Sequence, residues 1–114
     1  MTAHSPPEDI AAVRAEIDAL DRRIVALIAE RQRWVVAAGS LKKDEDGVRA
    51  PARVEQVIGR VRLLAETAGA SPDVVEHTYR ALIAAFIALE LDEHRARASS
   101  SPPDTRRPGT TPRL

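Results

Sequence analysis

The sequence predicts an all-α protein with three helices per chain, the first of which is unusually long. Prolines at positions 6, 7, 51, 72, 102, 103, 108 and 112 leave three uninterrupted runs, residues 8–50, 52–71 and 73–101. Because proline is tolerated in the first turn of a helix but disrupts its interior, each run is expected to hold one helix. Apolar residues recur in these runs at spacings of three and four, which is typical of helices with one buried face.

The first helix is predicted from about Glu8 to Lys43, where the polar run 44–47 ends it in a loop. About 35 residues span roughly 50 Å, whereas a compact domain of about 100 residues has a radius of gyration of about 13 Å. Two shorter helices cannot cover an apolar stripe of that length, so a second copy of the chain is expected to cover it in a homodimer. The stripe consists of Ile10, Val13, Ile17, Leu20, Ile24, Leu27, Trp34, Ala38 and Leu41.

The second helix is predicted from near Pro51 to near Gly69, and the third from Ser71 to about Arg97. Ser71-Pro72-Asp73 combines a hydroxyl cap, a proline in the first turn and an acid near the positive helix end. The expected organisation is a flexible N-terminus (1–7), a helical domain (8–97) and a disordered tail (98–114) that is almost without apolar residues. The predicted inward residues are Val54, Val57, Ile58, Val61, Leu64 and Ala65 in the second helix and Val75, Tyr79, Leu82, Ile83, Phe86 and Leu89 in the third.

The composition argues against several classes of function. Seventeen basic residues balance seventeen acidic ones, whereas a general nucleic-acid binder usually has a basic excess. The chain has no cysteine, and its three histidines lie far apart, so no metal site is expected. Residues 1–7 are short and polar and precede no apolar signal core, and no stretch is long enough to span a bilayer. The expected compartment is the cytoplasm.

Arg31 interrupts the apolar stripe of the first helix, between Leu27 and Trp34. An arginine in a buried stripe is costly unless an anion accompanies it. That anion is either a carboxylate of another helix, in an ion pair, or a carboxylate of a ligand.

Lys42 and Arg14 are two further cations of the first helix. On a continuous helix, the eleven residues from Arg31 to Lys42 return to within about 20° of the same face, roughly 16 Å along the axis. Lys42 could equally interact with the negative helix end. Arg14 lies roughly 25 Å from Arg31 and 42 Å from Lys42, too far to share a small ligand with Lys42 of its own chain. In an antiparallel dimer the partner subunit's Arg14 could close the site, although Arg14 taken alone reads as a surface residue.

Glu90 breaks the apolar face of the third helix in the same way, because it follows Phe86 on the inward side. A buried carboxyl without a partner tends to stay protonated and can then donate a hydrogen bond. The alternative is a salt bridge from Glu90 to one of the cations of the first helix. Arg53 begins the second helix against the helix dipole, which favours a nearby anion, and Arg49 in the preceding loop could assist. Both arginines could equally be surface charges.

Residues 13–31, followed by Gly39 and Lys42, are similar to the first helix of the all-α chorismate mutases. Residues 50–54 (Ala-Pro-Ala-Arg-Val) and 79–90 most resemble the branch that includes the isochorismate pyruvate lyases of salicylate biosynthesis. The resemblance covers about residues 9–97. It implies an intertwined homodimer that rearranges chorismate to prephenate in aromatic amino-acid biosynthesis, without a cofactor.

The resemblance also implies a role for each matching residue. Arg31 and the partner subunit's Arg14 would hold the substrate carboxylates, and Arg53 would join the carboxylate and ring contacts. Lys42 would donate to a carboxylate and to the ether oxygen, and Glu90 would donate to that oxygen from the other side. Apolar walls would come from Val35, Val48 and Ile87.

Two departures from the family pattern bear on the substrate and the mechanism. Many relatives have glutamine in place of Glu90, and Glu90 can donate only when protonated, which makes the mechanism depend on pH. Ala50 and Val54 stand where enteric-type enzymes have acids that contact the ring hydroxyl. Three functions therefore stay open: a chorismate mutase; a related enzyme acting on isochorismate or 4-amino-4-deoxychorismate; and a non-catalytic helical dimerisation or regulatory module.

Overall fold

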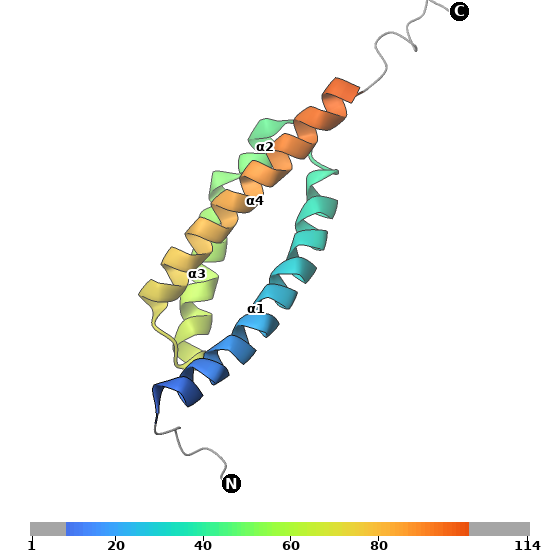
Figure 1. Cartoon of the computed structure of the whole chain (residues 1–114). Helices are drawn as coiled ribbons and strands as arrows, with labels where there is room; N and C mark the ends of the chain where they lie inside the picture. Colours follow the sequence, from blue (N-terminus) through green and yellow to red (C-terminus); the bar gives the residue numbers. More distant parts are fainter. Residues whose placement is uncertain (1–8, 101–114) are drawn as a thin grey trace, which may run out of the picture. The chain divides into compact units, whose positions relative to one another are not determined.

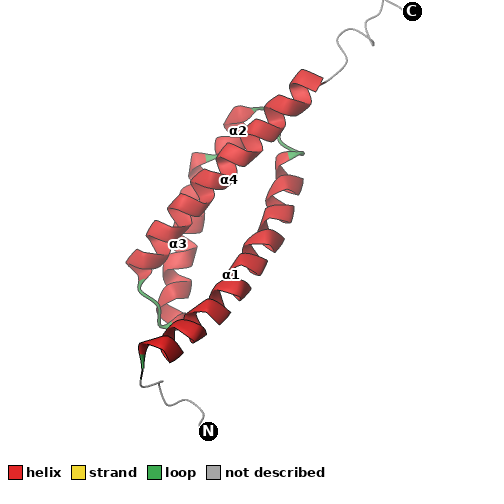
Figure 2. Ribbon diagram, in the orientation of Figure 1, coloured by secondary structure: helices red, strands yellow, loops and turns green. Residues whose placement is uncertain are grey.

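The computed structural model describes residues 9–100, which are helical apart from short connections (Figures 1 and 2). The elements are α1 (Ile10–Gly39), α2 (Glu45–Arg49), α3 (Pro51–Ala68) and α4 (Pro72–Ser100). No strand occurs in this described range, so the all-α prediction is confirmed, as are its three long helices. Helix α4 runs through Ser100, beyond the expected end near Arg97, while the expected flexible N-terminus 1–7 and tail residues 101–114 lie outside the described residues.

Helix α1 ends at Gly39, four residues before the predicted end at Lys43. The backbone N–H of Leu41 donates to the Ala38 carbonyl (3.0 Å), and that of Lys42 donates to the Gly39 carbonyl (3.2 Å). These bonds reach back three residues instead of four, which tightens the chain into a turn at the helix end. Lys42 consequently lies in the loop after α1, and its predicted place on the helical face of Arg31 is wrong.

A short helix, α2, occupies the segment that was predicted to be a polar loop. The Asp44 carboxylate accepts a hydrogen bond from the backbone N–H of Gly47 (2.9 Å) and caps the helix. Glu45 and Asp46 lie in its first turn and Arg49 in its last, which suits the helix dipole. The acids and the glycine that resemble a turn in the sequence are therefore the start of a helix. The segment carries the buried Val48, only 2% exposed, into the core.

Helices α3 and α4 lie side by side and form a hairpin (Figure 1). The turn between them follows the predicted signals. Gly69 ends α3 in the left-handed conformation (φ 80°), and the Ser71 hydroxyl accepts from the backbone N–H of Val74 (3.2 Å). Proline and glycine thus determine both ends of α3 locally.

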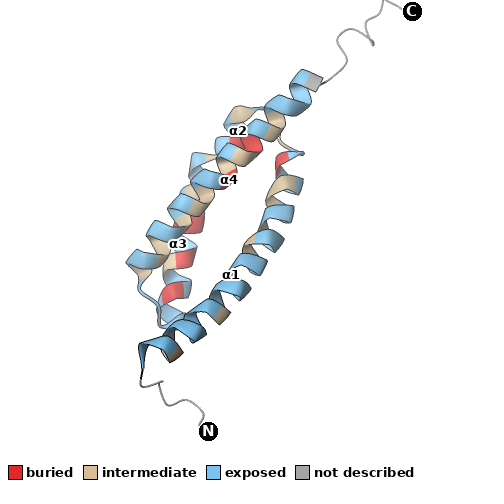
Figure 3. Ribbon diagram, viewed as in Figure 1, coloured by how far each residue is buried: buried red, intermediate tan, exposed pale blue. Residues whose placement is uncertain are grey.

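The core of this hairpin is narrower than predicted (Figure 3). Leu64, expected to face inward, is 57% exposed, because it lies at the edge of the α3 stripe and α4 covers only the centre of that stripe. Leu91, which was not expected in the core, is buried. The buried apolar side chains are Val48, Val57, Ile58, Val61, Ala65, Phe86 and Leu91.

The chain divides into two compact units, with the boundary after Val36. In the first unit, α1 carries its apolar stripe on the surface of the single chain. Ile17, Leu20, Ile24, Leu27 and Trp34 are all exposed, Trp34 by 72%. None of the helices in residues 9–100 is long and apolar enough to cross a membrane.

Candidate active site

Lys42 and Glu90 form an ion pair within the second unit. The Lys42 Nζ donates to the Glu90 Oε2 at 3.0 Å, and the two side chains are 29% and 7% exposed. Glu90 is the only buried charged residue among those described. A buried carboxylate needs a cationic partner to offset its lost hydration, and Lys42 provides one. The prediction that Glu90 points inward is confirmed, and its carboxyl takes part in the salt bridge that was the alternative to a neutral acid.

Two neighbouring elements surround the Glu90 carboxyl. On α4 it follows the buried Phe86 by one turn and precedes the buried Leu91. Against it lies Gly39, the buried last residue of α1: an added Cβ there would be 2.7 Å from the Glu90 Oε2. The carboxyl therefore occupies space that only a glycine leaves open.

The segment from Lys42 to Val48 is attached to α4 at a second point. The Arg95 guanidinium donates two hydrogen bonds of 2.8 Å to the Glu45 carboxylate. These hydrogen bonds hold the pKa of Glu45 below its ordinary value and raise that of Arg95. Together with the Lys42–Glu90 bond, this pair joins the loop and α2 to α4. Glu45 and Arg95 were missed in the sequence, where nothing links two charges fifty positions apart.

Arg49 and Arg53 are the two candidate arginines of the second unit. Arg53 is exposed in the first turn of α3, where its Nη1 donates to the Gln56 Oε1 at 2.6 Å. Arg49 is exposed at the end of α2, and its positive charge contributes slightly to lowering the pKa of Glu45. Ile87, a predicted wall residue, is half-buried on α4 three residues before Glu90. None of these three residues takes part in the bond between Lys42 and Glu90.

The remaining candidates, Arg14, Arg31 and Val35, belong to the first unit. Arg14 is exposed on α1, while Arg31 and Val35 are half-buried. The structure brings Lys42 and Glu90 together within the second unit, and the roles predicted for Arg14, Arg31 and Val35 stay predictions. Residues 9–100 hold no group of three or more His, Asp or Glu side chains that could bind a metal ion.

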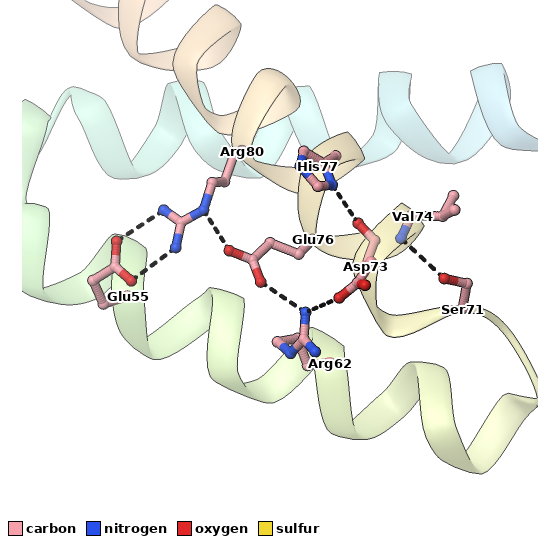
Figure 4. Close-up of polar contacts among 8 residues, drawn as sticks. All are labelled: Glu55, Arg62, Ser71, Asp73, Val74, Glu76, His77 and Arg80. Atoms are coloured by element: carbon pink, nitrogen blue, oxygen red, sulfur yellow. Dashed lines mark hydrogen bonds and ion pairs between the residues drawn. The ribbon is translucent and has the colours of Figure 1, made fainter.

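A second set of charges joins α3 to α4 near their connecting turn (Figure 4). Arg80 donates to both oxygens of Glu55 (2.9 and 3.0 Å) and to Glu76 (2.7 Å), and Arg62 donates to Glu76 (2.8 Å) and Asp73 (3.0 Å). The hydrogen bonds from Arg80 lower the pKa values of Glu55 and Glu76. Along α4, Arg80 lies ten residues from Glu90, roughly 15 Å. This network therefore stabilises the far end of the hairpin and is separate from the candidate site.

Comparison with known proteins identifies the family to which the chain belongs. Residues 13–91 match the family Chorismate mutase type II. The sequence is also 38% identical over 69 residues to the T-protein of Haemophilus influenzae, a match that covers 60% of this chain. The chain spans only 18% of the length of that relative. The family match includes every candidate residue from Arg14 to Glu90, so we conclude that the chain belongs to the chorismate mutase type II family.

Proposed function

We propose that this protein is a chorismate mutase, which rearranges chorismate to prephenate in cytoplasmic aromatic amino-acid biosynthesis. The observation that carries the proposal is the partly buried Lys42–Glu90 pair within a chain of this family. A buried ion pair contributes little to stability, because the desolvation of two charges offsets most of their attraction. A catalytic role explains the Lys42–Glu90 pair better than a role in stability does, because the proposed reaction needs hydrogen-bonding groups at this place.

The reaction requires positioning and charge stabilisation. Within one molecule, the ether C–O bond breaks while a C–C bond forms, and negative charge grows on the ether oxygen in the transition state. Donors that are already oriented toward this oxygen lower the barrier. The Lys42 ammonium has three N–H donors. It can therefore keep its bond to Glu90 and also donate to a substrate carboxylate and to the ether oxygen.

Glu90 has the second role in this proposal. In the structure its carboxylate accepts from Lys42. Binding of a dianionic substrate brings further negative charge to this buried carboxyl, which favours its protonated form. The protonated acid then donates to the ether oxygen from the side opposite Lys42. Substrate binding is thus expected to be accompanied by the uptake of a proton.

The arginines supply the anion-binding part of the proposed site. Arg31 and Arg53, assisted by Arg49, would hold the two carboxylates, since a guanidinium can bind a carboxylate through two parallel bonds. Arg14 lies roughly 25 Å from Arg31 along α1, so it would serve the site of the other subunit as the partner's Arg14. The exposed apolar stripe of α1 supports this homodimer, because a second chain would bury it. Val35, Val48 and Ile87 would form the apolar walls around the substrate ring.

One observation favours a second substrate class. Ala50, in the left-handed conformation (φ 37°), joins α2 to α3, and the half-buried Val54 follows within the first turn of α3. Both side chains are apolar at the positions where acidic residues would read the ring hydroxyl of chorismate. A related substrate, isochorismate or 4-amino-4-deoxychorismate, is therefore the second candidate.

Depletion of chorismate by the purified protein, with identification of the product, tests the proposal. Isochorismate and 4-amino-4-deoxychorismate are assayed in parallel. Lys42→Ala is expected to lower kcat/KM about 10²- to 10³-fold, as for loss of one oxyanion donor. Lys43→Ala, which removes the exposed neighbouring charge, serves as the matched control and should leave kcat/KM unchanged. Absence of turnover with all three substrates would refute the proposal and favour a non-catalytic helical module.

A further inference from the structure

We propose that Gly39 is a positioning residue, which keeps the Glu90 carboxyl in the place where Lys42 and the substrate can reach it. The inference rests on the proposed function and extends it to a residue that makes no side-chain contact of its own. It begins from the space around Gly39. A Cβ at this position would lie 2.7 Å from the Glu90 Oε2, 3.3 Å from its Cγ and 3.4 Å from its Cδ.

The glycine is needed for this space and not for its backbone freedom. Among the described residues, Gly69 is the only glycine with a positive φ, so Gly39 adopts a conformation open to any residue. As the last residue of a helix, Gly39 could be replaced by alanine without backbone strain, and alanine has the higher helix propensity. What alanine cannot do is leave room for the Glu90 carboxyl.

The atoms that would have to move are those of the proposed donor itself. Beyond the helix itself, the three atoms nearest to the added Cβ all belong to the flexible side chain of Glu90. The easiest adjustment is therefore a rotation of Glu90 that carries its Oε2 away from Gly39. Because the same oxygen accepts the 3.0 Å hydrogen bond from the Lys42 Nζ, this rotation breaks the ion pair.

Gly39 also helps to place Lys42. Its carbonyl accepts the hydrogen bond from the Lys42 backbone N–H (3.2 Å) at the end of α1. The turn thus fixes the backbone position of Lys42, and the absence of a side chain at Gly39 leaves the space that the Glu90 carboxyl occupies. Both partners of the pair are positioned from the same residue.

The other glycines among residues 9–100 do not share this property, which provides a control. At Gly59, in the middle of α3, an added Cβ would meet nothing within 4 Å. Gly59→Ala should therefore raise the melting temperature through helix propensity alone and leave activity unchanged. Gly39→Ala makes the same chemical change at the end of α1, where the space is filled by the carboxyl.

The kinetic test compares Gly39→Ala with Gly59→Ala and the parent protein. Gly39→Ala is expected to stay folded, with a melting temperature lowered by no more than that of Lys42→Met, which loses the same ion pair. Its kcat should fall about 10²-fold, as for a catalytic group displaced by about 1 Å, while its KM changes little because the arginines still hold the carboxylates. In a Glu90→Ala background the same substitution should cause no further loss of kcat. An unfolded Gly39→Ala protein, or an equal loss in the Glu90→Ala background, would overturn the inference.

A stability cycle separates this inference from the proposed function. Lys42→Met is combined with Gly39→Ala, and melting temperatures are measured for the four proteins. If Gly39→Ala has already parted the ion pair, Lys42→Met should lower the melting temperature less in that background than in the parent. Additive shifts would refute the role of Gly39, even for an active enzyme. Non-additive shifts in a protein that converts none of the three substrates would support the geometry and refute the proposed function alone.

Discussion

The Lys42 ammonium donates to the Glu90 carboxylate at 3.0 Å, although the two residues are 48 positions apart and Lys42 lies outside α1. The bond joins the loop after α1 to the buried face of α4. It also sets a condition on catalysis, because the same carboxyl must gain a proton before it can donate to a substrate oxygen.

Replacement of Glu90 tests this condition. Glu90→Gln keeps the shape and the hydrogen-bond donor of a protonated Glu90, so it should retain substantial kcat/KM. Glu90→Ala removes the donor and should lower kcat/KM strongly. The measurement is kcat/KM for the three proteins, and a Glu90→Gln protein as poor as Glu90→Ala would rule out the donor role.

Substitution of Arg31 tests the proposed carboxylate clamp. Arg31→Ala should lower kcat/KM by roughly 10²-fold, about 3 kcal/mol, because a charge-assisted bond to a substrate carboxylate is lost. Arg31→Lys should also have a low kcat/KM, since an ammonium group cannot form the two parallel hydrogen bonds that a planar guanidinium makes with a carboxylate. Arg33→Ala, at an exposed position two residues along α1, is the matched control and should behave as the parent. Near-normal turnover by Arg31→Lys would contradict the assigned role.

The exposed stripe of α1 leads to a prediction about assembly. Light scattering of the purified protein should give twice the chain mass of 12.4 kDa. Leu27→Asp, which places a charge on the stripe, should weaken the dimer and lower activity with it, because the partner's Arg14 would be lost from the site. Leu63→Asp, at an equally exposed leucine of α3, should leave the dimer intact. A fully active monomer at assay concentrations would contradict both the dimer and the shared site.

The network around Arg80 predicts how stability depends on pH. Its hydrogen bonds lower the pKa values of Glu55 and Glu76 below 4.5, so the ionised carboxylates stabilise the fold above that pH. This contribution should be lost as pH falls below 4.5 through the lowered pKa values. Arg80→Met should reduce the melting temperature at pH 7 and make it less sensitive to acid below pH 4.5. Arg60→Met, at another exposed arginine of α3, is the control, and an equal effect there would refute the assignment.

The sequence alone determined the features that depend on neighbouring residues. Pro51 and Pro72 start α3 and α4, and Gly69 ends α3, because backbone limits act within one turn of a helix. The inward direction of Glu90 followed from its spacing to Phe86. The long apolar stripe of α1, the three long helices and the resemblance to the family were likewise readable from the order of residues.

Only the tertiary structure decided which distant residues meet. Asp44 caps α2 through a local bond that resembles a turn in the sequence, and the helix is then held by Arg95, fifty positions beyond Glu45. Lys42 reaches Glu90 because α1 ends early at Gly39, and Gly39 matters through the volume that it leaves for another helix. Such pairings depend on how the helices pack against one another. Helical periodicity predicts which face of each helix is apolar, but it does not predict which residues of two faces fit together.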